Sequence, residues 1–215
     1  RLTSSLPVAT AIALVTTAIT LTIAAEEPYS AVIAMGLPAI AVLSARAFRG
    51  SWLATLGVAL YLGISATFYT LFTGAAALTV VSLIALFTAL YEHTWRPIVR
   101  LVIMAVGSIA IALIAWGPYL WSVMHSPVPL QTTAQHYLPE EGTQIPVPFL
   151  SFSIVGFLCL MGLIYIVIRL NDVEVRALGI SLLGTYLWTV VSMVATLAGT
   201  TLLSFRLEVI VVLLF

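Results

Sequence analysis

"IVRLVIMAVGSIAIALIAWGPYLWSVM", residues 98 to 124, contains a single charged residue, Arg100, close to its start. A helix needs about 20 consecutive apolar residues to cross the roughly 30 Å hydrocarbon core of a bilayer, and this stretch is longer than that. Runs of this length are typical of transmembrane helices rather than of strands or buried core helices. The stretch therefore predicts a membrane-spanning helix and places the chain among membrane proteins.

The same pattern recurs along the 215 residues, 62% of which are hydrophobic and only 7% charged. Soluble domains carry roughly a quarter charged residues. We therefore predict an all-α fold, a polytopic transmembrane helical bundle that forms one domain over residues 1–215, with about seven spans and a truncated eighth. The net charge of zero argues against a nucleic-acid partner. The predicted spans are 5–24, 29–48, 52–72, 75–91, 98–124, 149–168, 177–203 and the segment from 209 onward.

Two local features of the sequence predict how the helices bend or end. Pro38 lies inside the second span, where it is expected to kink the helix or break its hydrogen-bond ladder. Thr73-Gly74 separates the third and fourth spans and predicts a tight turn at the membrane surface.

The arginines indicate the orientation of the chain. If the spans alternate, Arg206 lies on one side of the membrane, while the other seven arginines share the opposite side. Cytoplasmic loops carry an excess of basic residues, so the arginine-rich side is expected in the cytoplasm of a multi-pass plasma-membrane protein. The arginines of that side are Arg1, Arg46, Arg49, Arg96, Arg100, Arg169 and Arg176.

Charged residues are missing from the middle of every predicted span, where no Arg, Asp, Glu or His occurs. Ion-coupled transporters and proton pumps usually hold ionisable groups at that depth, so this pattern argues against them. The polar residues instead gather outside, which suits an enzyme acting on a lipid-linked substrate.

Four segments resemble one known family, the actinobacterial galactan-priming arabinofuranosyltransferases. These segments are "AQHYLPEEGTQIPVPFL" (134–150), "LWTVVSMVATLAGTTLLSFRLE" (187–208), "EEPYSAVIAMGLPAIAVL" (26–43) and "YTLFTGAAAL" (69–78). The resemblance implies a C-type glycosyltransferase fold. It also implies decaprenyl-phosphoryl arabinose as donor, cell-wall galactan as acceptor, membrane lipids as surroundings and an active face outside the plasma membrane.

The resemblance also implies what this chain does not contain. The family is longer, and its fold carries the essential carboxylate in the first external loop, which we expect upstream of Arg1. A soluble C-terminal domain is likewise expected beyond this chain, which is interpreted as an internal transmembrane fragment. The catalytic base is therefore not assigned to any residue here.

Acidic residues of the outer side are candidates for contact with the substrate. Glu26 and Glu27 precede a proline on a short external turn, and Glu140 and Glu141 lie in the long polar loop. A carboxylate is needed to accept the proton of the acceptor hydroxyl, and carboxylates could also hold a divalent metal. The alternative for both pairs is a solvated charge that keeps its loop outside.

Three further residues are candidate substrate contacts. His136 and Tyr137 could hydrogen-bond or stack on a sugar, or could tie the loop to the membrane surface. Arg206 could grip the departing lipid phosphate through two parallel hydrogen bonds, since negative charge grows there during transfer. Its alternatives are a snorkelling arginine or one paired with a nearby glutamate.

Two other functions remain open at this point. A transporter or flippase for a polyprenyl-linked glycan would also be an apolar helical bundle. Such a protein would be expected to show inverted repeats with broken helices. A non-catalytic scaffold subunit of a membrane complex is the third possibility.

Overall fold

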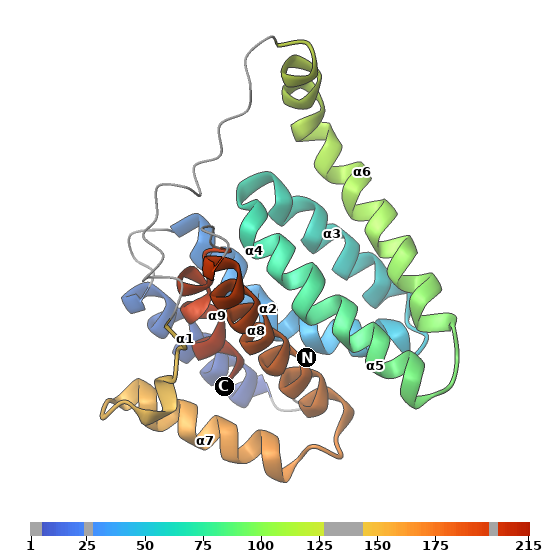
Figure 1. Cartoon of the computed structure of the whole chain (residues 1–215). Helices are drawn as coiled ribbons and strands as arrows, with labels where there is room; N and C mark the ends of the chain where they lie inside the picture. The colour runs from blue at the N-terminus through green and yellow to red at the C-terminus, as the bar shows by residue number, and fades with distance from the viewer. Residues whose placement is uncertain (1–5, 24–27, 127–143, 198–201) are drawn as a thin grey trace.

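Helices make up the described part of the computed structural model, which covers residues 6–23, 28–126, 144–197 and 202–215 (Figure 1). The first half contains α1 (Leu6–Ile23), α2 (Pro28–Phe48), α3 (Trp52–Phe68), α4 (Thr70–Ala75), the π-helix η1 (Ala76–Ser82), α5 (Leu83–Tyr91) and α6 (Arg96–Met124). The second half contains the 3₁₀-helix η4 (Pro148–Leu150), α7 (Ile154–Ile168), α8 (Val173–Leu197), the 3₁₀-helix η5 (Ser204–Leu207) and α9 (Glu208–Leu214).

Four helical segments of the described chain are long and apolar enough to cross a membrane: 29–48, 70–91, 96–124 and 173–197. Three shorter apolar helices cover 9–22, 52–68 and 154–168. The all-helical class predicted from the sequence is thus confirmed for the described residues, and the four long apolar helices fit a membrane protein. The number of spans is smaller by this measure than the seven predicted, because several apolar runs form helices shorter than the runs themselves.

The turn predicted at Thr73-Gly74 is wrong, since both residues lie inside a helix that continues from α4 through η1 into α5. The chain breaks instead at Tyr69, whose backbone is extended at φ −150° and ψ 100°. The Thr73 hydroxyl group donates a hydrogen bond to Ser65 Oγ of α3 at 2.9 Å, so it is paired within the bundle. A lone glycine such as Gly74 is tolerated in a helix, so neither residue forces a turn.

Helix α2 forms the centre of the core and runs unbroken from Pro28 to Phe48, with Pro38 inside it. Its buried face carries mostly small residues, and Ala34, Leu37 and Ala41 are completely buried. Small side chains let neighbouring helices approach closely in a membrane. Helix α6, by contrast, has only 6% of its apolar window buried and extends along one side of the bundle (Figure 1).

Arginine side chains gather at one end of the bundle, where α2, α5 and α8 meet. Arg46 near the end of α2 donates to Glu174 in the first turn of α8, through Nε at 2.8 Å and Nη2 at 2.5 Å. Arg49 lies 3.9 Å from Glu92, which follows α5. Five of the arginines that the sequence assigns to one side therefore meet there, since Arg96, Arg100 and Arg176 contact or line the same region. We call this region the arginine-rich end.

The pair between Arg46 and Glu174 gives a first testable prediction. Glu174→Arg places two positive charges together and is expected to destabilise the protein by about 1 kcal/mol, because both side chains are more than a third exposed and solvent screens them. The double variant Arg46→Glu/Glu174→Arg restores an opposite-charge pair and is expected to recover most of the loss. Melting temperatures of the full-length protein and its variants in detergent measure this cycle. A double variant no more stable than the single one would contradict it.

Candidate functional site

Arg206 lies in η5, at the other end of the bundle, and makes a polar contact with a residue far away in sequence. Its Nη1 donates to the Tyr69 hydroxyl group at 3.3 Å. The Tyr69 ring packs edge-on against Tyr29 of α2, with centroids 5.5 Å apart, and lies 4.9 Å from the ring of Phe72 in α4. We call these four residues the Arg206 cluster. Three segments of the chain, α2, the α3–α4 break and η5, thus meet around the Tyr69 side chain.

The backbone before Arg206 is fixed on α8. Leu202 N–H donates to Ser192 Oγ at 3.2 Å, and the Trp188 indole N–H donates to the Leu202 carbonyl at 3.3 Å. Leu203 adopts a positive φ of 54°, which turns the chain into η5, and Arg206 N–H then donates to the Leu203 carbonyl. These hydrogen bonds attach the segment that precedes the half-buried Arg206 to α8.

Ser204 adds an unsatisfied polar group beside Arg206 in sequence. Its side chain is completely buried, and within the described part of the chain its hydroxyl oxygen has no hydrogen-bond partner. A buried hydroxyl left in this way costs about 1–3 kcal/mol.

The Arg206 cluster is well separated from the arginine-rich end. Helix α3 begins beside that end and finishes at Phe68, next to Tyr69, and its 17 residues make a helix about 25 Å long. Arg206 therefore lies at the end of the described bundle opposite the arginine-rich end.

The other six predicted contacts lie outside the described residues. They are Glu26, Glu27, His136, Tyr137, Glu140 and Glu141, which fall in 24–27 and 127–143. Their roles stay predictions. In the part of the chain that the structure describes, no group of three or more His, Cys, Asp or Glu residues could hold a metal ion. No ligand set for a divalent metal is therefore assigned.

Sequence reasoning missed Tyr69, Tyr29 and Ser204. The segments "YTLFTGAAAL" and "EEPYSAVIAMGLPAIAVL" contain both tyrosines, but the family resemblance that these segments carry assigns neither tyrosine a role. No local signal marks Tyr69 in the sequence, because it lies inside the apolar run predicted as the span 52–72.

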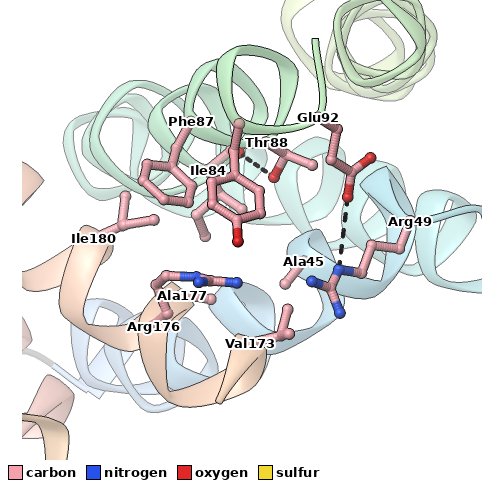
Figure 2. A pocket seen from close by; sticks show the side chains of 11 residues that line it. Ala45, Arg49, Ile84, Phe87, Thr88, Glu92, Val173, Arg176, Ala177 and Ile180 are labelled. Carbon is pink, nitrogen blue, oxygen red and sulfur yellow. Dashed lines mark hydrogen bonds and ion pairs between the residues drawn. The ribbon is translucent and has the colours of Figure 1, made fainter. Parts of the chain in front are cut away.

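A pocket at the arginine-rich end is the other candidate, and its lining is structural (Figure 2). The Arg176 guanidinium carbon lies 5.5 Å from the ring centroid of Phe87 and 5.2 Å from that of Tyr91. Figure 2 shows Arg49 turned away from Arg176 and toward Glu92. These cation–π and ionic contacts join α2, α5 and α8, so we assign the pocket to packing.

The sequence of this chain is similar to proteins of one known family. The whole chain, residues 1–215, matches the family model described as "Arabinofuranosyltransferase N terminal". The chain is 51% identical over its full length to a protein of Corynebacterium glutamicum named galactan 5-O-arabinofuranosyltransferase. Proteins of the same name from Mycolicibacterium smegmatis and Mycobacterium tuberculosis are 41% and 38% identical over 89% and 90% of the chain. The chain spans 32% of the length of each of these relatives.

Proposed function

Because this chain belongs to the family described as "Arabinofuranosyltransferase N terminal", we propose that the whole protein transfers an arabinofuranose residue to galactan. The observation that carries the proposal is the 51% identity over all 215 residues to a galactan 5-O-arabinofuranosyltransferase. The apolar helices support a membrane location, where a lipid-linked donor would be available.

The donor we propose is decaprenyl-phosphoryl arabinose, used on the outer face of the plasma membrane by a C-type glycosyltransferase fold with about seven spans. Seven of the eight basic residues are expected on one side of the membrane, and the side with few basic residues normally faces outward. Arg206 lies at the end opposite the arginine-rich end, which supports an external active face.

In the proposed reaction, an acceptor hydroxyl oxygen of galactan forms a bond to the anomeric carbon of arabinose. The bond from that carbon to the phosphate oxygen breaks, and the polyprenyl phosphate leaves. A carboxylate accepts the hydroxyl proton. Arg206 is proposed to bind the phosphate, because its planar guanidinium can offer parallel donors to two phosphate oxygens as their charge grows.

Tyr69 is proposed to hold Arg206 in this orientation. The Tyr69 hydroxyl accepts from Nη1, so that nitrogen is fixed while the guanidinium fork remains planar.

The experiment uses the full-length protein, reconstituted in vesicles with radiolabelled decaprenyl-phosphoryl arabinose and a galactan acceptor. We expect label to appear in the galactan. Label that crosses the bilayer without entering galactan would contradict the proposal and favour the flippase alternative.

A further inference from the structure

Two neighbouring hollows lie at the arginine-rich end, beside the start of α6. The first measures about 800 Å³ with its solvent-open part and is lined by Phe48, Arg49, Gly50, Glu92, Thr94, Arg96 and Arg100. The second measures about 830 Å³ on the same basis and is lined by Trp52, Thr94, Trp95, Arg96, Val99, Arg100 and Ile103. They share Thr94, Arg96 and Arg100, so they form one continuous depression with a charged part and an apolar part.

The charged part carries three arginines and one glutamate, a formal net charge of +2. Arg100 is committed to the fold, because it donates to the carbonyls of Ala47 and Gly50 and stacks 4.8 Å from the centroid of Trp52. Gly50 has a φ of 125°, which side chains rarely tolerate, and so this turn is well defined. Arg100 therefore adds positive charge to the lining of the depression, although its side chain is already bonded to the backbone.

The remaining two arginines are available to a ligand. Arg49 is only loosely paired with Glu92 at 3.9 Å and stays 43% exposed. Arg96 is exposed, and among the described residues its side chain makes no ion pair. It begins α6, where the positive end of the helix dipole also favours an anion.

The apolar part follows the first two turns of α6. Val99 and Ile103 are four residues apart and therefore lie on one face of the helix. Their side chains are 57% and 42% exposed, and Trp52, which also lines the apolar part, is 62% exposed. Ile103 is about 10 Å along the helix axis from Arg96. Along α6, the depression is therefore positively charged near Arg96 and apolar near Ile103.

We propose that this depression binds an anionic phospholipid. The phosphodiester lies against Arg96 and Arg49, and one acyl chain lies along Val99 and Ile103. A free phosphate would use only the charged part and a neutral lipid only the apolar part, so an anionic lipid is the ligand that both parts fit. Exposed tryptophans such as Trp52 and Trp95 are typical of the headgroup level of a membrane, where such a lipid would sit.

The first test measures lipid retention by native mass spectrometry of the full-length protein, with phosphatidylglycerol, with phosphatidylcholine of the same chains, and with glycerol 3-phosphate. We expect retention of phosphatidylglycerol, and a loss of about tenfold in Arg96→Gln, which gives up one charged hydrogen bond. Arg169→Gln removes the same charge from a residue that lines neither hollow and is expected to keep full retention. An equal loss in both variants means non-specific surface charge and overturns the proposal. Equal retention of phosphatidylcholine also overturns it.

The second test addresses the acyl chain. Val99→Trp fills the groove without changing charge and is expected to lower phosphatidylglycerol retention severalfold. Val102→Trp adds the same side chain at a residue that is 55% exposed and outside both hollows, and is expected to have no effect. If Val99→Trp retains phosphatidylglycerol like the wild type, the apolar part holds no acyl chain. The same conclusion follows if glycerol 3-phosphate is retained to the same extent as the lipid. Neither test measures sugar transfer, so the proposal stands or falls independently of the proposed reaction.

Discussion

Arg206→Ala is expected to lower kcat/KM for arabinose transfer by the full-length protein about a hundredfold, and chiefly through kcat. Removing one preorganised donor to a developing anion typically costs two to three orders of magnitude, or about 3–4 kcal/mol of barrier. Arg206 fits this description because its backbone N–H donates to the Leu203 carbonyl, the neighbouring Leu202 is bonded to Ser192 and Trp188 of α8, and its side chain donates to Tyr69. The measurement is the initial rate with radiolabelled donor and galactan.

Three companion variants separate binding of phosphate from support of the fold. Arg206→Lys keeps the charge but loses the planar fork, so it is expected to recover only part of the rate. Tyr69→Phe removes the hydroxyl that orients Arg206 and is expected to cost roughly fivefold. Arg169→Ala, which removes an arginine after α7, is expected to leave the rate unchanged.

The melting temperature of each variant must be measured beside its rate. If Arg206→Ala melts like the wild type and transfers arabinose at the wild-type rate, Arg206 does not bind the phosphate. If Arg206→Lys is as active as the wild type, charge alone suffices and the two parallel hydrogen bonds are not used.

The helices could be predicted from the sequence because apolar length in a bilayer is a local property. Each predicted span begins or ends within a few residues of an observed helix, for example 98–124 against Arg96–Met124. The break at Tyr69 could not be predicted in the same way. It depends on packing against Tyr29 and Phe72 and on the contact with Arg206, which lies 137 residues further along the chain.

The sequence suggests Arg206 as a candidate substrate contact because it is the exception to the charge asymmetry of the loops, and that role stays a prediction. Its partners could not be found in this way, since nothing local in "YTLFTGAAAL" indicates that Tyr69 faces a distant arginine. The depression beside α6 was missed for a related reason. Arg96 and Arg100 had been counted only for their side of the membrane, whereas their position next to Trp52 depends on the turn at Gly50.

Gly184→Ala is expected to lower the stability of the protein by about 1–3 kcal/mol or more. Gly184 in α8 lies against the π-helix η1, and a Cβ added there would collide with the carbonyl oxygen of Thr79. It would also lie 3.0 Å from the Thr79 carbonyl carbon and 2.6 Å from Leu83 Cδ1. Because two of these atoms belong to the backbone, the clash cannot be relieved by a rotamer change, and α8 must move away from η1.

Gly74→Ala is the matched control, because a Cβ at Gly74 in α4 would meet no atom within 4 Å. Alanine favours a helix by up to about 1 kcal/mol over glycine, so this variant is expected to be neutral or slightly stabilised. Thermal melting of both variants in the same detergent gives the comparison. Equal melting temperatures would mean that α8 and η1 are not in close contact. A lower melting temperature in Gly184→Ala alone would instead show that the close approach of α8 to η1, seen at Gly184 and Thr79, stabilises the protein.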